Sequence, residues 1–549
     1  MGTDSASGPR TVRSEQPLPE GEGGHRLYAL TFDNAVNWTV TACVILAFLV
    51  SAVVLIAYLR SPILDMHGFR QTQTAISVYW MEKGQGLVNY QTPVAGAPWT
   101  IPFEAPVYQM SVAILDKVTP FGLDAAGRLT SWLYLVGSAL TGARILGALL
   151  PRNPLAGRIF IGLLLLAPQY LFWGRTFLVE TCAVFFGLVL VLGVIRYYRD
   201  GRLVWLAVAA GASLLCALAK STSWPAFALA SAMFWLAESA ETRRVLWLRT
   251  AALVAVAAAT LAATFAWNHF ADAQKSLSPF GAALTSANLA GWNFGDLTQR
   301  MSADLWLKIV PDRMLPAALG LFWPAAAIVA LFGLRGPVDR RRNALVAAAL
   351  LALFLTPIML FTNLHMVHNY YQTANALFLV AVAAVALAAA AKGGRAGSIA
   401  VLVIVPVIVV GQLIHFAAAY KPLLDQRLRE SPSFTAAMAA RQMVPEGRSL
   451  YVFGVDWSSE VLYYARRKGI AFAPWYDPGK IRLALSTPQA FVGDTPLGGV
   501  VDCRETMQKY GNLTPDLDAF VNQMQRSPGA KTVDTDGGCR VVALGGGGR

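Results

Sequence analysis

Repeated apolar stretches, each long enough to cross a lipid bilayer, constrain the fold of this chain most. A helix of about 20 apolar residues spans roughly 30 Å of hydrocarbon. With 55% hydrophobic and only 14% charged residues, the chain lacks the polar surface of a soluble domain. We therefore predict an all-α polytopic membrane domain of about eleven transmembrane helices, near residues 38–59, 128–150, 158–173, 176–195, 203–219, 222–238, 247–268, 316–334, 343–361, 372–391 and 398–419.

Basic residues are distributed unevenly between the two sides of this predicted bundle. If the N-terminus is cytoplasmic, the short turns of the opposite side hold little more than Arg175 and Lys220. The positive-inside rule then places the N-terminus in the cytoplasm and, with an odd number of spans, the C-terminal region outside it. Cytosolic anchoring beside anionic lipid explains the net charge of +13, so no nucleic-acid partner is expected. The cytosolic turns carry Arg144, Arg152, Arg158, Arg196, Arg199, Arg202, Arg243, Arg244, Arg249, Arg335, Arg340, Arg341, Arg342, Lys392 and Arg395.

Changes in composition divide the chain into three parts. Residues 1–30 are rich in Gly, Ser, Pro and charge, which predicts a disordered cytoplasmic tail. Residues 31–420 form the predicted membrane domain, with long outer loops at 61–127 and 269–315. The loop at 61–127 contains two moderately apolar helical segments, Thr72–Lys83 and Pro106–Val118, of the kind that lie along a membrane surface. Residues 421–549 have the composition of a small extracytoplasmic α/β domain.

The C-terminal part shows a strand, helix, strand pattern. We expect a buried strand at 449–454, a helix at 458–468 that Gly469 ends, and a second strand at 470–474. It has no GxGxxG loop, so nucleotide binding is not expected there. Cys503 and Cys539 both lie in this part, where an oxidising compartment permits a disulfide. The other cysteines fall in apolar spans and are expected to be small core residues: Cys43, Cys182 and Cys216.

Ionisable and polar aromatic residues recur where the predicted helices reach the outer face. A charge at the membrane costs a few kcal/mol to bury, so its retention indicates a partner or a ligand. Positions spread over about three hundred residues converge on one side of the bilayer, which predicts a functional site. The set comprises Asp65, His67, Arg70, Glu104, Arg175, Glu180, Lys220, His365, His368, Tyr370 and Tyr371.

Each of these residues also has a purely structural interpretation. Arg175 and Glu180 could form an ion pair that fixes one helix end, and Lys220 could extend its ammonium to the interface. His365 and His368, three residues apart, could be polar residues at a helix entrance. The tyrosines could belong to the aromatic belt of the membrane interface. The combination, rather than any single residue, favours a functional site.

Four short motifs lie among these residues: Phe103-Glu104-Ala105-Pro106, Gly174–Thr181 with Arg175 and Glu180, Ala219-Lys220-Ser221-Thr222, and His365–Gln372. Together they resemble motifs of the polytopic glycosyltransferases of the GT-C superfold. The resemblance is to the protein mannosyltransferases and bacterial aminoarabinose transferases, a glycosyltransferase family 39-like group. One difference concerns the acidic pair that these enzymes carry in the first surface helix, because Arg70-Gln71 stands there instead. The run Asp65-Met66-His67-Gly68-Phe69-Arg70-Gln71 resembles a motif that a bacterial subgroup carries.

The resemblance implies transfer of a sugar from a polyprenyl-phosphate donor to an acceptor hydroxyl, with inversion, for glycan assembly in the cell envelope. The reaction would occur at the outer face of a bacterial-type cytoplasmic membrane, and the acceptor would be a glycan, a lipid or a protein. The base is Asp65 or Glu104, with Glu180 as a third candidate. Expected substrate contacts are His67, Gln71, Tyr371 and Trp292. Candidates for holding the donor phosphate are Arg70, Arg175, Lys220, His365 and His368.

A divalent metal such as Mg²⁺, Mn²⁺ or Zn²⁺ could bridge the phosphate and the carboxylates. Its candidate ligands are Asp65, His67, Glu104 and Glu180. Two other functions remain open at this point. Another lipid-linked glycan enzyme, an oligosaccharide ligase or a phosphodiester transferase, would use the same cations at the same interface. A secondary transporter is less favoured. It would place charges in broken helices near the bilayer midplane, often in repeated halves, whereas the charged residues of this chain lie at the ends of the predicted helices and no such repeat is seen.

Overall fold

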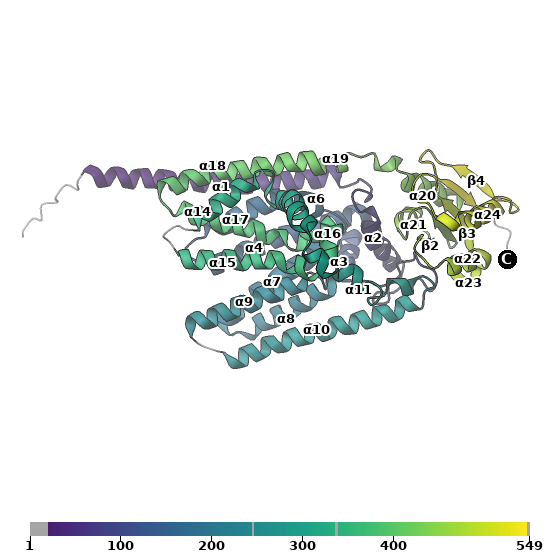
Figure 1. Ribbon diagram of the computed structural model, residues 1–549, viewed down its shortest axis with the longest axis horizontal. Helices are drawn as coiled ribbons and strands as arrows, with labels where there is room; N and C mark the ends of the chain where they lie inside the picture. Colours follow the sequence, from purple (N-terminus) through teal and green to yellow (C-terminus); the bar gives the residue numbers. More distant parts are fainter. Residues whose placement is uncertain (1–19, 244–245, 335–338, 546–549) are drawn as a thin grey trace, which may run out of the picture.

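The computed structural model describes residues 20–243, 246–334 and 339–545, with side chains from residue 32 onward. Most long helices run side by side along the long axis of the molecule (Figure 1). A five-stranded sheet with short helices lies at the end that also holds the C-terminus. The molecule is therefore a helical bundle with a small α/β unit on one end, as the composition predicted.

All eleven apolar stretches are helical, although several begin or end a few residues from the predicted limits. The stretch at 158–173 is broken at Ala167, and the stretch at 316–334 is broken at Gly320. The helices are α1 (Glu20–Tyr58), α4 (Leu123–Leu149), α5 (Leu155–Leu166), α6 (Pro168–Trp173), α7 (Glu180–Asp200), α8 (Leu203–Ala219), α9 (Trp224–Thr242), α10 (Trp247–Ser276), α13 (Leu315–Leu319), α14 (Trp323–Gly333), α15 (Arg340–Leu360), α17 (Ala376–Ala391) and α18 (Arg395–His415).

The predicted count of eleven spans is not confirmed. By length and composition, six helical runs in the described part of the chain could each cross a membrane. A seventh is possible if the pair Leu305–Leu319 and Trp323–Gly333, bent by 79°, forms one broken span. Helices α5, α8 and α17 are apolar but shorter than 18 residues. The six runs are Phe32–Tyr58, Leu123–Leu149, Glu180–Asp200, Trp247–Ser276, Arg340–Leu360 and Arg395–Met443, the last of which begins with α18.

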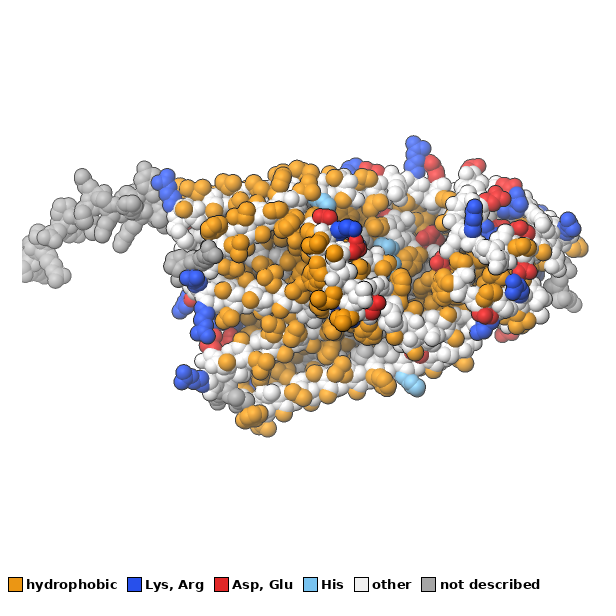
Figure 2. Space-filling view, in the orientation of Figure 1, with side chains coloured by type: hydrophobic (Ala, Val, Ile, Leu, Met, Phe, Trp, Pro, Cys, Tyr) orange, Lys and Arg blue, Asp and Glu red, His pale blue; other side chains and the backbone are white. Residues whose placement is uncertain are grey.

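Surface chemistry agrees with a membrane location. Apolar side chains cover the region of the long helices, and Lys and Arg side chains gather at the bundle end away from the sheet (Figure 2). The proposed orientation, with the N-terminus in the cytoplasm, rests on this gathering of basic side chains at one end of the bundle. Helix α1 begins at Glu20, so the chain is helical over part of the segment predicted to be a disordered tail. Residues 1–19 of that segment lie outside the described residues.

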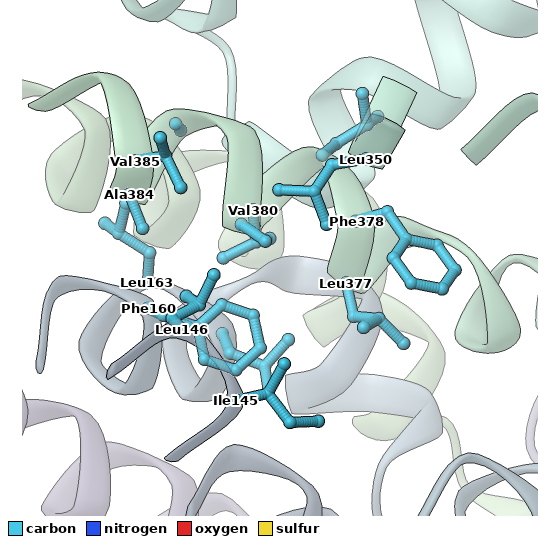
Figure 3. Packing of buried hydrophobic residues seen from close by; sticks show 14 of the residues in the cluster. Ile145, Leu146, Phe160, Leu163, Leu350, Leu377, Phe378, Val380, Ala384 and Val385 are labelled. Carbon is cyan, nitrogen blue, oxygen red and sulfur yellow. The ribbon is translucent and has the colours of Figure 1, made fainter. Parts of the chain in front are cut away.

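The largest apolar core extends through the long helices of the bundle, and part of it lies among α4, α5, α15 and α17. Figure 3 shows Ile145, Phe160, Leu350 and Leu377 from these four helices packed against one another. Helix α4 approaches α5 closely because residue 142 is glycine: a Cβ there would lie 2.5 Å from Cε1 of Phe160. Since lipid tails are as apolar as these side chains, close packing rather than hydrophobic exclusion holds such helices together.

Short helices between the long ones build the face of the bundle that meets the sheet. The two surface helices predicted in the first loop are present as α2 and α3. The other segments form the second loop, the connection before α17 and the connection after α18. The elements are α2 (Gly68–Glu82), α3 (Val107–Val118), η1 (Gly281–Leu284), α11 (Ala290–Phe294), α12 (Leu297–Arg300), η2 (Leu305–Met314), α16 (Thr362–Val367), η3 (Asn369–Ala374), η4 (Phe416–Tyr420) and α19 (Lys421–Leu424).

The sheet unit consists of one five-stranded sheet and its covering helices. The strand order is β2-β1-β3-β5-β4, with β1 parallel to β2 and β3, and β5 antiparallel to β3 and β4. Its elements are η5 (Leu428–Glu430), α20 (Pro432–Met443), β1 (Ser449–Phe453), α21 (Glu460–Ala465), β2 (Gly469–Ala471), α22 (Pro478–Ser486), α23 (Pro488–Val492), β3 (Leu497–Asp502), η6 (Gly511–Leu513), α24 (Thr514–Gln525), β4 (Lys531–Asp534) and β5 (Arg540–Ala543).

The predicted strand, helix, strand pattern is present with shorter elements. Helix α21 ends where Arg466 adopts a left-handed conformation, with φ of 54°, three residues before the glycine expected to end it. That glycine, Gly469, instead opens β2. A Cβ at Gly469 would lie 2.2 Å from the Leu450 carbonyl oxygen, so close approach to β1 requires glycine there.

The sheet unit is joined to the first loop of the bundle by backbone hydrogen bonds. The free edge of β2 is covered because the Ala471 N–H donates to the Val94 carbonyl oxygen at 2.9 Å. The Ile63 N–H also donates to the Tyr464 hydroxyl at 2.7 Å. One apolar core runs from the strands into α2, α3 and the start of α7. The sheet unit therefore has a fixed position on the bundle.

Cys503 and Cys539, the pair singled out in the sequence, are joined by a disulfide between the end of β3 and the start of β5. Cys43, Cys182 and Cys216 are free and buried. We predict that alkylation of the denatured, unreduced protein will modify three thiols, and that prior reduction will raise the number to five. Intact-mass spectrometry measures both numbers. Five modified thiols without reduction would contradict the bond and an oxidising location of the sheet unit.

Candidate active site

Helix α2 begins at the site, and its start aims two neighbouring side chains in different directions. His67 precedes the helix in a left-handed conformation, with φ of 57° and ψ of 41°. Because consecutive helical residues are rotated by about 100°, Arg70 and Gln71 diverge. The Arg70 guanidinium pairs with Glu104, whereas the Gln71 amide donates to Asp65. The first turn of α2 thus serves two separate ionic clusters.

Hydrogen bonds to Glu104 and to both of its neighbours fix the backbone at this position. The Tyr90 hydroxyl donates to the Glu104 carbonyl oxygen at 2.8 Å and accepts from the Phe103 N–H at 2.9 Å. The Trp267 indole donates to the Phe103 carbonyl oxygen at 2.9 Å. The next residue, Ala105, donates its N–H to the carbonyl oxygen of Leu218 in α8 at 3.0 Å. These contacts place the Phe-Glu-Ala-Pro motif beside the end of α8, where Lys220 follows.

Two carboxylates and two cations form the first cluster. The Lys220 ammonium lies 3.3 Å from Glu104 Oε1 and 3.1 Å from Glu180 Oε1, and Arg70 pairs with Glu104 from the other side. Lys220 also lies over the Tyr371 ring, 4.8 Å from its centre. Burial alone would raise the pKa of Glu104, but Arg70 and Lys220 outweigh it and lower the pKa to about 2. Glu104 is therefore ionised across the physiological range.

The second cluster is built around Asp65, which is 3% exposed. Its Oδ2 lies 3.0 Å from Arg175 Nη2 and 3.3 Å from Arg128 Nη1. The Arg128 guanidinium also donates to the carbonyl oxygens of Ser61 and Pro62. Burial would raise the pKa of Asp65, but the charges of Arg128 and Arg175 outweigh it and hold the pKa below its ordinary value. An acid held ionised by two arginines is a poor proton acceptor.

A cavity of about 790 Å³ lies between the loop helices and the sheet unit. We call it the central cavity. It is lined by residues from the first turn of α2, the end of α8, the end of α10, the second loop, the segment before α17 and two loops of the sheet unit. Such a volume is in the range of ligand sites.

The structure brings half of the predicted site residues to the central cavity. The others lie behind its wall, in the Asp65 cluster, beside Lys220 or in the packing around the histidines. Glu180 contacts the cavity only through Lys220, which lies between them. The residues that line it are Arg70, Glu104, Lys220, Trp292, His368 and Tyr371, and those behind the wall are Asp65, His67, Gln71, Arg175, Glu180 and His365.

The histidines form an uncharged group with aromatic neighbours. The His67 and His368 rings lie edge to face, with centres 4.9 Å apart, and His368 stacks on Tyr370 at 5.2 Å. Burial lowers the pKa of His368 to about 4 and that of His365 to about 3. Both side chains are therefore neutral at neutral pH. They can donate or accept a hydrogen bond but do not add positive charge for a phosphate.

Many of the residues that line the central cavity lie outside the predicted set, and four of them have charged or aromatic side chains suited to a ligand. Lys275, near the C-terminal end of α10, lies over the Phe103 ring at 5.0 Å. Asp456 and Trp457 follow β1, and Trp475 follows β2. Loops at the carboxyl ends of parallel strands commonly hold ligands. That rule, applied to the predicted strands at 449–454 and 470–474, could have identified both tryptophans.

The predicted metal ligands do not form a metal site. In the described ranges, no group of three or more His, Cys, Asp or Glu side chains is arranged to hold a metal ion. Asp65 is neutralised by arginines, and Glu104 and Glu180 by Arg70 and Lys220. His67 packs among aromatic rings rather than beside these carboxylates. We therefore derive no catalytic step that uses a protein-bound metal.

The chain has the GT-C fold that its sequence motifs resemble. No protein-family model matches the sequence, and no curated protein matches it either. The fold is shown by the crystal structure of ArnT from Cupriavidus metallidurans in the apo state. That alignment has a TM-score of 0.58 and 15% sequence identity, and it covers 92% of this chain and 98% of ArnT.

Two other solved structures align less closely. The arabinofuranosyltransferase AftD from Mycobacteria has a TM-score of 0.49 and 17% identity, over 91% of this chain but only 40% of AftD. The oligosaccharyltransferase AglB from Archaeoglobus fulgidus, in complex with an inhibitory peptide and a dolichol-phosphate, has a TM-score of 0.48 and 12% identity. That alignment covers 93% of this chain and 74% of AglB. The fold assignment rests on ArnT alone.

The Asp65 cluster generates a prediction about stability. Asp65→Asn removes the charge that compensates two buried arginines, and leaving a buried charge unpaired costs about 3 to 5 kcal/mol. We expect a large fall in the thermal midpoint of the purified protein, measured by the exposure of buried thiols on heating. Asp516→Asn, which breaks the exposed Arg482–Asp516 pair, is the control and should change the midpoint little. Equal midpoints for the two variants would refute the structural role of Asp65.

Proposed function

We propose that this protein transfers a sugar from a polyprenyl-phosphate donor to an acceptor hydroxyl in the central cavity. The observation that carries the proposal is the convergence of Glu104, Arg70 and Lys220 in one cavity beside the ends of the membrane helices. The shared GT-C fold supports it. The distribution of arginines favours a cytoplasmic membrane of bacterial type, with the N-terminus in the cytoplasm and the sheet unit outside.

The donor phosphate would bind between Arg70 and Lys220. A phosphodiester at the membrane surface keeps its hydrocarbon tail in lipid and its sugar in the water-filled cavity. Arg70 offers a planar fork of N–H donors and Lys220 a compact point charge, and both suit phosphate. Lys275 adds a third cation on the α10 side of the same cavity. These groups would stabilise the negative charge that develops on the phosphate as the sugar leaves.

Glu104 is our candidate for the general base. It lines the cavity, whereas Asp65 and Glu180 lie behind its wall. In the absence of donor its basicity is suppressed by Arg70 and Lys220. A bound phosphate would compete for the same two cations, which would weaken their hold on Glu104 and raise its basicity. The base would thus become effective only when the donor is present.

The proposed step is a single displacement. The acceptor oxygen attacks the anomeric carbon from the face opposite the phosphate, and its proton passes to a Glu104 carboxylate oxygen. The bond between the anomeric carbon and the phosphate oxygen breaks, and its electron pair leaves with the polyprenyl phosphate. The products are the glycosylated acceptor, with inverted anomeric configuration, and polyprenyl phosphate.

The sheet unit would supply the acceptor side of the cavity. Asp456 has a left-handed backbone, with φ of 55°, and its Oδ1 accepts hydrogen bonds from the Trp457 N–H at 2.7 Å and the Trp475 indole at 2.9 Å. Trp475 is 50% exposed. Its ring offers an apolar face to a sugar, and Asp456 offers oxygen atoms to sugar hydroxyls. The acceptor would therefore be a carbohydrate, approaching from the sheet side while the donor enters from the membrane.

The decisive experiment uses purified protein, a radiolabelled polyprenyl-phosphate monosaccharide series and washed membranes of the source organism as acceptor. We expect release of polyprenyl phosphate and labelling of a membrane glycan by the native protein. Glu104→Gln should slow the reaction about 100- to 10,000-fold, the usual contribution of a general base. Donor binding should persist, because glutamine keeps the shape of the side chain that it replaces.

The matched control is Glu446→Gln, a change of the same chemistry at an exposed position of the sheet unit. It should leave the rate unchanged. No release of polyprenyl phosphate by the native protein from any donor of the series would reject the proposed function. Native rates in Glu104→Gln would reject Glu104 as the base while leaving the function intact.

The acceptor assignment has its own test. Trp475→Ala removes the exposed ring, so we expect the half-saturating amount of acceptor membrane to rise about tenfold, as for loss of one aromatic contact. The half-saturating donor concentration should stay the same. Trp247→Ala, which removes a 76% exposed tryptophan from the start of α10, is the control. A change in donor saturation with constant acceptor saturation would contradict the assignment.

A further inference from the structure

A second cavity, of about 720 Å³, lies on the other side of α2 and shares no lining residue with the central cavity. The last turn of α2 lines it, together with the segment before α4, the connection after α18, and helices α20 and α21. We call it the basic cavity. Five cations line it: Arg60, Lys83, Arg429, Arg441 and Arg466.

None of these five cations forms an ion pair with any described residue. Elsewhere the bundle does pair its arginines, as with Arg342 and Glu238 at 3.0 Å. Three carboxylates also line the basic cavity, but the oxygens of Asp124 already accept hydrogen bonds from the Tyr463 and Tyr464 hydroxyls. Positive charge is thus in excess, and its donors are largely unused. The other two carboxylates are Glu82 and Asp116.

Aromatic rings orient the guanidinium groups. Arg466 lies over the Tyr79 ring at 5.5 Å from its centre, and Arg429 lies over Phe434 at 6.0 Å. A guanidinium stacked on a ring keeps the N–H groups of its edge available for a ligand. Pre-oriented forks of this kind suit the paired oxygens of a phosphate group.

The basic cavity also borders the membrane. Arg60 follows the end of the Phe32–Tyr58 span, and Leu123 and Asp124 begin the next span. Phe121, 42% exposed, lines the cavity, and Ile114 and Val118 of α3 are 64% and 72% exposed. A ligand that fits both the cationic lining and the neighbouring exposed apolar side chains carries an anionic phosphate at one end and hydrocarbon at the other.

We propose that the basic cavity binds the phosphate headgroup of an anionic membrane phospholipid. Arg429, Arg441 and Arg466 hold the phosphate, and the acyl chains leave along Phe121 and the apolar face of α3. The lipid ties the sheet unit, which supplies the three arginines, to the membrane surface. Lipid binding at this cavity is inferred without any of the residues assigned to the proposed sugar transfer.

The test is native mass spectrometry of the full-length protein in detergent with equal amounts of phosphatidylglycerol and phosphatidylcholine. We expect phosphatidylglycerol to be retained preferentially. In Arg429→Gln/Arg441→Gln/Arg466→Gln, the affinity should fall on the order of a hundredfold, because each cation beside an anionic lipid contributes about fivefold. The charge-matched control, Arg482→Gln/Arg526→Gln/Arg540→Gln, alters the same sheet unit away from the basic cavity and should retain the lipid.

Two further arms make the result decisive. The variant Arg429→Lys/Arg441→Lys/Arg466→Lys keeps the charge and should keep most of the preference, which separates loss of charge from misfolding. Equal retention of the two lipids, or equal loss in the test and control triple variants, would overturn the proposal. Inorganic phosphate, followed by ³¹P line broadening, provides the other arm. Arginine-dependent binding of phosphate without any lipid preference would assign the cavity to a soluble ligand and overturn the lipid assignment.

Discussion

The arrangement of the whole site depends on one buried ion cluster, in which Asp65 bridges Arg128 and Arg175. These residues come from the segment after α1, from α4 and from the connection before α7, so the carboxylate joins three parts of the bundle. Two buried arginines without it would lose their compensation, which costs far more than an exposed pair is worth. Because Gln71 also donates to Asp65, the cluster sets the rotation of α2 and thereby directs Arg70 into the central cavity.

The two ionic clusters differ in a way that suits different tasks. The Asp65 cluster is closed on all sides, so no ligand can exchange with its members without disrupting the fold. The Glu104 side chain is 17% exposed and shares its cations with a cavity. A phosphate can therefore replace a carboxylate as the partner of Arg70 or Lys220 at little structural cost. The Asp65 cluster is thus suited to stabilising the fold, whereas Arg70 and Lys220 are suited to binding a ligand.

The sequence predicted the helical bundle, the two surface helices, the sheet unit and six of the residues that line the central cavity. Apolar length and interface charges are local properties, so they can be recognised without a structure. The pairing of charged side chains is not a local property, because the partners can lie far apart in the sequence. Arg128 lies 63 residues from Asp65, at the first position of a stretch that was predicted only as a membrane span. Without that partner Asp65 resembled a free base, whereas the structure shows its carboxylate paired with two buried arginines. The tryptophans of the sheet unit follow two predicted strands and could have been singled out for that reason, but their place at the central cavity depends on how the sheet unit packs on the bundle.

Helix α2 runs between the two cavities, and residues at its two ends line one cavity each. Its first turn presents Arg70 to the central cavity and its last turn presents Lys83 to the basic cavity. A helix of 15 residues is about 22 Å long. Both ends adjoin the ends of membrane spans, which places α2 along the membrane surface with a cation at each end. A lipid bound in the basic cavity, at the C-terminal end of α2, would resist tilting of this helix. Arg70, at the other end of α2, would then stay at the depth of the donor phosphate. Placement of the reactive cation would then depend on the bilayer itself as well as on the protein core.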